Sequence, residues 1–184
     1  MESDGDLAWE TTGGETEYAC PGFAVRRDDV RLPNGSATSY HYVDEPPAVV
    51  VLPFTPAGEV VTIAEWRQAV GRVNRGLPAG SVEPDADADL AAAAARELAE
   101  ETGYEPADLE RLCAVEPSNG IANSVHHHFL ARGCEPTTER DLDADESIRV
   151  HTTDYDDLLA AVLDGEIRDG RTALAVLRYE FDRR

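Results

Sequence analysis

Three glutamates lie close together in the segment Arg96–Tyr104, which reads Arg-Glu-Leu-Ala-Glu-Glu-Thr-Gly-Tyr. On a helix, Glu97 and Glu101 are four residues apart and share a face, while Glu100 lies on its flank. Arg96 is four residues before Glu100, within reach of an ion pair. Crowded carboxylates repel one another unless a cation lies among them, and hard oxygen ligands suit Mg²⁺ or Mn²⁺. The spacing indicates a divalent-metal site, and the alternative is a solvated acidic face.

A helix from about Asp87 to Thr102 would hold these side chains in place. Five successive alanines, Ala91–Ala95, give it strong helix propensity. An aspartate near its start suits the N-cap, and Gly103 suits the C-terminal stop. The glycine- and proline-containing stretch from Gln68 to Pro84 is expected to be a long loop whose shape matters more than its side chains.

The glutamate segment resembles the signature of the Nudix hydrolase family. That signature is a Gly, five residues, a Glu, seven residues and then a nine-residue string, whose fixed positions all match Arg96–Tyr104. Leu77-Pro78-Ala79-Gly80 supplies the preceding turn. From Gly80 to Arg96, however, this chain has two residues more than the family spacing.

No glutamate occupies the family's first-Glu position in this chain. Counting back from Arg96 the position is Ala88, and counting forward from Gly80 it is Ala86. Asp87 is the best substitute among the nearby acids. In the family this residue mainly supports the loop and helix, so the difference concerns loop geometry more than metal binding.

The resemblance implies roles for individual residues. Glu97 and Glu101 are the expected principal metal ligands, with Glu100 as a further or bridging ligand. Arg96 would orient the carboxylates, and the Ala79 carbonyl would complete the shell. The expected cofactor is Mg²⁺, with Mn²⁺ as the alternative.

A catalytic base is expected from the acidic loop Glu139–Glu146. Glu146 holds the matching place, and Asp143 and Asp145 are the alternatives. For substrate binding we single out Gly80, Arg67 to grip phosphates and Trp66 to stack on a base, since guanidinium suits bidentate phosphate contact. A strand-end core aromatic is the other interpretation of Trp66.

Over roughly residues 22 to 180 the chain looks like the ADP-ribose pyrophosphatase branch of the family, for example in its Glu-Trp-Arg segment ending at Arg67. This implies hydrolysis of ADP-ribose to AMP and ribose 5-phosphate. Gly76 and Asn119 depart from the branch, which commonly has Glu and Pro there. Other nucleoside diphosphate sugars or nucleotide derivatives stay open as substrates, as does a non-catalytic ligand-binding module.

His126 and His128 offer a second metal hypothesis. Alternate residues of a strand point to the same face, so these two side chains could cooperate, whereas His127 could not. No third ligand is evident in the sequence, which favours an ordinary structural role.

Composition narrows the class of partner. The 184 residues carry 37 acidic and 16 basic side chains, a formal net charge of −21, which opposes binding to nucleic acid or anionic membranes. Such a surface suits multimolar salt, so a halophilic protein is expected. No signal peptide or membrane span is visible, and three dispersed cysteines fit a reduced cytoplasm.

Strand and helix patterns alternate along the chain, which favours an α/β fold. The resemblance implies a Nudix-type α/β/α sandwich with a mixed sheet. We expect residues 1–45 to be a polar tail, loose to about residue 16, followed by a small N-terminal antiparallel β element, and residues 46–184 to be the Nudix hydrolase domain. The nearly continuous apolar run Ala48–Phe54 predicts a strand buried on both faces. The small β element is too small to be stable alone, so it should pack on the main domain or on a partner subunit, which suggests a homodimer.

Overall fold

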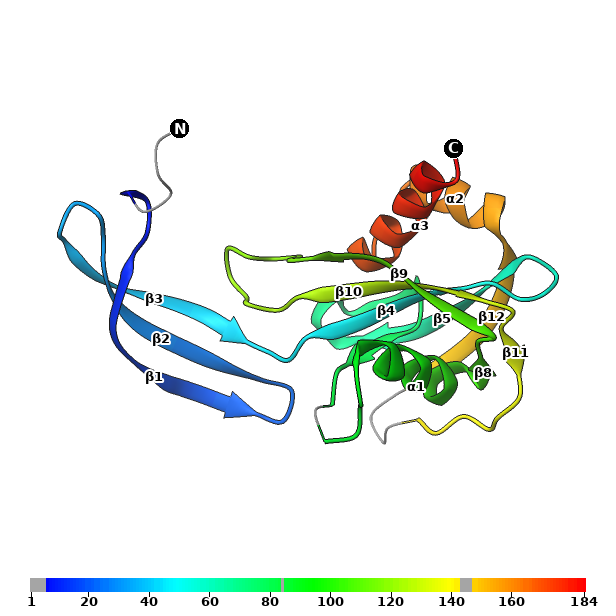
Figure 1. The fold of residues 1–184 in the computed structure, drawn as a ribbon, viewed down its shortest axis with the longest axis horizontal. Helices are drawn as coiled ribbons and strands as arrows, with labels where there is room; N and C mark the ends of the chain where they lie inside the picture. Colours follow the sequence, from blue (N-terminus) through cyan, green and yellow to red (C-terminus); the bar gives the residue numbers. More distant parts are fainter. Residues whose placement is uncertain (1–5, 84, 143–146) are drawn as a thin grey trace. The chain divides into compact units, whose positions relative to one another are not determined.

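The computed structural model describes residues 6–83, 85–142 and 147–184. The chain divides into two compact units (Figure 1). One contains the chain up to Pro46 together with Ser118–Ser124, and the other contains Pro47–Pro117 and Val125–Arg184. In the described part of the chain, no helix is long and apolar enough to cross a membrane.

The first unit is a three-stranded antiparallel sheet of β1 (Glu10–Cys20), β2 (Phe23–Arg31) and β3 (Ala37–Asp44). The expectation of a loose tail to about residue 16 is wrong from Glu10 onward, because β1 pairs with β2 along its whole length. The side chains of β1 are mostly polar. Ion pairs such as Arg27 to Glu15, at 3.0 Å, join β1 to β2 where an apolar face is lacking. The sequence has no hydrophobic alternation there to indicate the strand.

The segment Ser118–Ser124 belongs to this first unit although it is distant in sequence. The Val43 amide donates to the Ile121 carbonyl at 2.8 Å, and the Asn123 amide donates to the Val43 carbonyl at 3.1 Å. The Tyr40 hydroxyl donates to the Gly120 carbonyl at 2.7 Å. The departure at Asn119 therefore lies in a segment that is tied to β3.

The second unit is built on a mixed four-stranded sheet in the order β7-β4-β10-β9. Strands β4 and β10 are parallel, and the other pairs are antiparallel. A second sheet has the order β12-β5-β6, and a short pair joins β8 and β11. The strands are β4 (Ala48–Pro53), β5 (Glu59–Arg67), β6 (Arg72–Gly76), β7 (Ala79–Ser81), β8 (Tyr104–Glu105), β9 (Asp108–Val115), β10 (His126–Arg132), β11 (Glu135–Pro136) and β12 (Ile148–Asp154).

The α-helices in the described part of this unit are α1 (Leu90–Thr102), α2 (Tyr155–Leu163) and α3 (Gly170–Asp182), and a short 3-10 helix spans Gln68–Val70. The helix predicted from Asp87 begins three residues later, because Asp89 is its N-cap. The stretch Gln68–Pro84, expected to be one loop, contains the short strands β6 and β7. Both are too short and too rich in glycine or polar residues to show strand periodicity.

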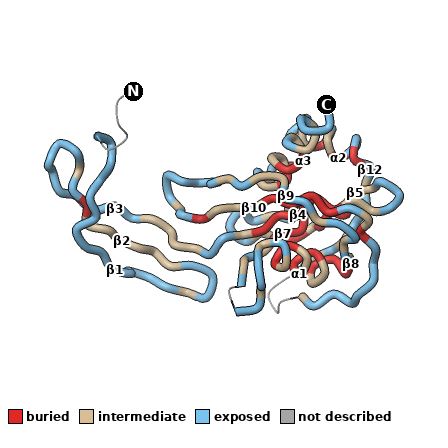
Figure 2. The backbone as a smooth tube through the Cα atoms, in the orientation of Figure 1, coloured by how far each residue is buried: buried red, intermediate tan, exposed pale blue. Residues whose placement is uncertain are grey.

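Strand β4 lies at the centre of the core and is buried on both faces, as its apolar run predicts. Val49 and Val51 pack in a cluster with Leu98 of α1. Val50 and Leu52 pack in the opposite cluster, whose helical members come from α2 and α3. Figure 2 shows that the buried residues are concentrated in the second unit. The sheet therefore separates α1 from α2 and α3, which is the α/β/α sandwich that was expected.

Candidate active site

Helix α1 is capped at both ends, which fixes the register of its glutamates. The Asp89 carboxylate accepts from the amides of Ala91 and Ala92 at 2.9 and 2.8 Å. Gly103 ends the helix at φ 79°, a left-handed conformation that glycine adopts readily. Both capping positions agree with the sequence expectations.

Glu97 and Glu101 lie on the buried side of α1, against Ala79 and Gly80 of β7. The Ala79 amide donates to the Glu101 carboxylate at 3.0 Å. A Cβ on Gly80 would lie 2.1 Å from the Glu97 carboxylate, so only glycine permits this approach. The Pro-Ala-Gly turn and the glutamate string thus form one compact unit of backbone and carboxylates.

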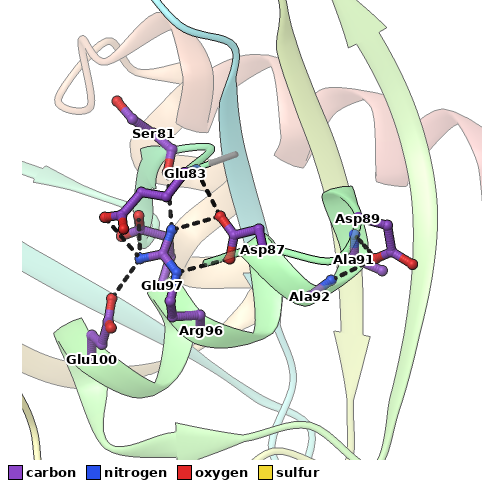
Figure 3. A network of polar contacts seen from close by, with 9 residues as sticks. All are labelled: Ser81, Glu83, Asp87, Asp89, Ala91, Ala92, Arg96, Glu97 and Glu100. Atoms are coloured by element: carbon purple, nitrogen blue, oxygen red, sulfur yellow. Dashed lines mark hydrogen bonds and ion pairs between the residues drawn. The ribbon is translucent and has the colours of Figure 1, made fainter. Parts of the chain in front are cut away.

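Arg96 makes five hydrogen bonds in this arrangement, one for each N–H donor of a guanidinium. Figure 3 shows the residues around it. Its Nη1 donates to Glu97 at 3.0 Å and to Glu100 at 2.7 Å. The latter is the ion pair that the four-residue spacing predicts. The remaining donors contact Asp87 at 2.9 and 3.0 Å and the Ser81 carbonyl at 3.0 Å.

Asp87 faces Arg96 across the loop before α1, where this chain has no glutamate at the family's first-Glu position. Its side chain is buried, and its second carboxylate oxygen also accepts from the Glu83 amide at 2.8 Å. The hydrogen bond from Arg96 is the main reason that the pKa of Asp87 lies below its ordinary value. The same contacts raise the pKa of Arg96, which stays charged. Asp87 therefore connects the loop to the helix. This is the supporting role expected of the residue that replaces the family's first glutamate.

The glutamates face a cavity of about 140 Å³. The loop before β12 contributes Asp141 and Leu142 to its wall, and the Asp141 amide donates to the Glu100 carbonyl at 3.1 Å. Sequence reasoning did not single out these two residues, since nothing local distinguishes them from their neighbours. The expected base Glu146 and its alternatives, Asp143 and Asp145, lie outside the described residues.

The donor set suits a hard divalent cation. Glu97, Glu100 and Glu101 all line the cavity and offer carboxylate oxygens. Among the described residues, no three acidic, histidine or cysteine side chains already converge as a metal cluster. The carboxylates instead engage Arg96 and the Ala79 amide. The close approach of Glu97 to Gly80 keeps the Glu97 carboxylate against the backbone of β7.

A neighbouring cavity of about 410 Å³ contains Trp66 in its wall and shares Leu142 with the carboxylate cavity. Trp66 is half exposed, and its indole donates to Gln68 at 2.9 Å, so it is not a core aromatic. Arg67 forms an ion pair with Glu65 at 2.7 Å. Arg149 also lines this cavity. The sequence offered no spacing or motif to indicate Arg149.

The histidines of β10 lie apart from this site. His128 is fully buried, and neither of its ring nitrogens has a hydrogen-bond partner in the described structure. Burial, followed by the charges of His126 and Arg171, lowers the pKa of His128 to about 4. It is therefore neutral at pH 7, and no metal cluster involving described residues surrounds it.

The NUDIX domain profile matches residues 44–174. The chain therefore belongs to the NUDIX family, as its glutamate string indicated, and the expected fold class is confirmed.

Individual relatives agree with this assignment. An ADP-ribose pyrophosphatase of Bacillus subtilis (strain 168) is 36% identical over 150 residues, covering 81% of this chain and 80% of its own. A methanol dehydrogenase activator of Bacillus methanolicus is 33% identical over 165 residues, covering 88% of each chain. A solved ADP compounds hydrolase shares the fold, with a TM-score of 0.82 at 21% identity over 95% of this chain and 94% of its own.

Proposed function

We propose that this protein is a divalent-metal-dependent pyrophosphohydrolase that cleaves ADP-ribose to AMP and ribose 5-phosphate. The observation that carries the proposal is the cavity lined by Glu97, Glu100 and Glu101, with Arg96 saturated between carboxylates. Similarity to the Bacillus subtilis ADP-ribose pyrophosphatase supports the substrate class.

Diphosphate hydrolysis places water on a highly anionic phosphorus. Mg²⁺ or Mn²⁺, when bound, would neutralise the phosphate oxygens and lower the pKa of the attacking water. Glu97 and Glu101 are the proposed principal ligands, Glu100 is a further ligand, and the Ala79 carbonyl lies in the same turn. Arg96 donates to both Glu97 and Glu100 and would orient their carboxylates.

The proton of the attacking water needs an acceptor, and Glu146 is the proposed base on the strength of the resemblance. Beside the carboxylate cavity, half-exposed Trp66 is the proposed stacking surface for the nucleoside. Arg67 is the proposed phosphate ligand, and it would exchange its Glu65 partner for substrate. Gly80 is the proposed point at which the backbone approaches the bound substrate closely.

A homodimer is part of the proposal. In the described part of the first unit, Val30 is the buried hydrophobic side chain, while Trp9, Tyr18 and Phe23 are 50%, 57% and 41% exposed. A sheet with so little core needs a further surface to pack against. Light scattering during size-exclusion chromatography tests this, and a mass near the 20.0 kDa of one chain would contradict it.

The cellular setting is proposed as a salt-rich cytoplasm without nucleic-acid or membrane partners. Cys20, Cys113 and Cys134 are free thiols, which suits a reducing compartment. The net charge of −21 supports both the salt-rich setting and the lack of nucleic-acid or membrane partners.

Product analysis tests the reaction. The purified protein is incubated with Mg²⁺ in molar KCl against ADP-ribose, ADP-glucose, GDP-mannose, NADH and diadenosine polyphosphates, before and after chelation. Glu101→Gln removes a proposed metal ligand. The activity of this variant should fall by more than the about 10–100-fold loss that is typical when an outer-shell partner is removed. Glu110→Gln, which alters an exposed carboxylate paired with Arg132, is the matched control.

AMP and ribose 5-phosphate from ADP-ribose, lost in Glu101→Gln but retained in Glu110→Gln, is the expected result. Preferred turnover of another compound keeps the mechanism and changes the substrate. Folded protein that turns over none of them, with or without metal, contradicts the hydrolase proposal for these substrates and favours a ligand-binding module.

A further inference from the structure

The segment Leu77–Gly80, which connects β6 to β7 and includes the start of β7, is called the turn below, and it is held from a second side by helix α3. The Leu77 amide donates to the Thr172 hydroxyl oxygen at 3.0 Å, in a fully buried contact between residues far apart in sequence. Thr172 has no solvent exposure and Leu77 has 2%. Buried amides are almost always paired, so this bond fixes where the turn begins.

The Thr172 hydroxyl is itself oriented by a carboxylate. It donates to Asp169 at 2.6 Å, which leaves its oxygen lone pairs free to accept from Leu77. The Asp169 carboxylate also accepts from the Thr172 amide at 3.1 Å, as the N-cap of α3. Arg171 contributes a further contact to Asp169 at 3.3 Å. Asp169, Thr172 and Leu77 therefore form a relay in which each bond polarises the next.

Gly76 shows how closely the turn approaches this relay. A Cβ at Gly76 would lie 2.8 Å from the Thr172 hydroxyl oxygen and 3.2 Å from the Asp169 carboxylate. A larger residue would push the strand end away from α3. The departure of Gly76 from the glutamate common in the related branch is thus explained by the packing of this chain.

The other end of the same short turn contacts the glutamates. After Leu77, the ring of Pro78 restricts the backbone, and the Val51 amide donates to the Pro78 carbonyl at 3.0 Å. Ala79 then donates to Glu101 at 3.0 Å. The turn therefore joins α3 on one side to the carboxylate face of α1 on the other.

We propose that Asp169 and Thr172 are positioning residues, which set the Leu77–Gly80 turn against Glu97 and Glu101 and thereby the geometry of the metal site. They act through the turn, without contact with substrate. The inference rests on the proposed function, since it deepens the account of the same site.

Thr172→Val tests this, because it keeps the shape of the side chain and removes the hydroxyl. Thr172→Ser keeps the hydroxyl and serves as the rescue. Thr62→Val is the matched control, since it removes another fully buried threonine hydroxyl, whose oxygen lies 3.5 Å from the His151 carbonyl. All are assayed well below their unfolding temperatures, with Mn²⁺ binding followed by titration calorimetry without substrate, and kcat and KM measured separately.

We expect Thr172→Val to weaken Mn²⁺ binding and lower kcat by about tenfold, as loss of an outer-shell partner does, with KM for the nucleotide little changed. Thr172→Ser should restore both, and Thr62→Val should leave both near wild type. Asp169→Asn, which keeps size and removes the charge, should repeat the effect and carries the test if Thr172→Val does not fold.

Folded Thr172→Val or Asp169→Asn with wild-type Mn²⁺ affinity and kcat would overturn the inference. So would an equal loss in Thr62→Val, since it would point to general destabilisation. Wild-type protein that binds Mn²⁺ but hydrolyses none of the tested compounds would contradict the proposed function alone, because the effect of Thr172→Val on Mn²⁺ affinity is measured without substrate.

Discussion

Arg96 offsets part of the negative charge of the candidate site, because one guanidinium contacts three carboxylates at hydrogen-bonding distance. Asp87 occupies Nε and one Nη2 donor, which directs Nη1 to Glu97 and Glu100. The side chain that fixes Arg96 therefore influences how the proposed metal ligands are presented, although it lies outside α1.

Neutralising Asp87 should weaken metal activation. In Asp87→Asn the bidentate charge contact is lost, Arg96 can rotate toward the glutamates, and the Mg²⁺ concentration for half-activation should rise by about tenfold. Asp85→Asn removes the same charge from an exposed position in the same loop and should behave as wild type. Metal titrations of hydrolysis compare the two, and equal shifts would show that only net charge matters.

His128 should make stability depend on pH between neutrality and pH 5. Its pKa is about 4 when folded against an ordinary 6.5, so the unfolded state binds more protons as pH falls below 6.5. Stability is thus lost on acidification, by about 2 kcal/mol from pH 7 to pH 5. His128→Leu should remove this part of the loss. Urea unfolding at both pH values measures it, and an unchanged difference in the variant would contradict the assignment.

At the scale of elements, the C-terminal end of α1 connects the glutamates to a distant loop. The Gly103 carbonyl accepts hydrogen bonds from the amides of Thr137 and Thr138, at 3.1 and 3.3 Å. This contact leads into the loop whose Asp141 reaches the Glu100 carbonyl. The stop of the helix is therefore also an attachment point for one wall of the carboxylate cavity.

Gly103→Ala should destabilise more than Gly165→Ala. Both glycines follow helices with positive φ, 79° and 73°, so each alanine incurs about 1–2 kcal/mol of left-handed strain. A Cβ at Gly103 would also lie 2.8 Å from the Thr138 carbonyl oxygen, whereas nothing lies within 4 Å at Gly165. Thermal unfolding compares the variants. Equal losses would mean that the Thr138 loop moves aside without cost.

The elements that the sequence predicts well are those with strong periodicity or propensity. The apolar run of β4 and the alanines of α1 act locally, so both elements appear where expected, apart from the helix start. Strands β1, β6 and β7 were missed because pairing partners, ion pairs and close backbone approach stabilise them. None of these leaves a pattern in neighbouring residues.

The same division applies to the candidate site. Spacing on one helix brought Arg96, Glu97 and Glu101 to the same region. Asp87 was named as a candidate, but its contact with Arg96 depends on where the helix begins. Asp141 and Arg149 enter from segments whose approach depends on the fold of the whole unit.

At the scale of the molecule, charge dominates. All 16 basic residues are arginines, and 37 acidic residues oppose them. Exposed like charges destabilise the folded state at low ionic strength, and salt screens them, with a Debye length of about 3 Å at 1 M. We expect the unfolding temperature to rise steadily from 0.1 M to molar KCl. Scanning calorimetry checks this, and a flat or falling curve would contradict adaptation to salt.

The attachment of Ser118–Ser124 to β3 affects how the protein can be cut and recombined. The first unit is made from two stretches of chain, and Val43 bonds to both Ile121 and Asn123 of the second stretch. A truncation at Pro46 would discard the sheet but leave its seven-residue partner behind, exposed in the middle of the remaining chain. Exchanging this sheet between relatives as a cassette therefore requires a graft at two places in the gene.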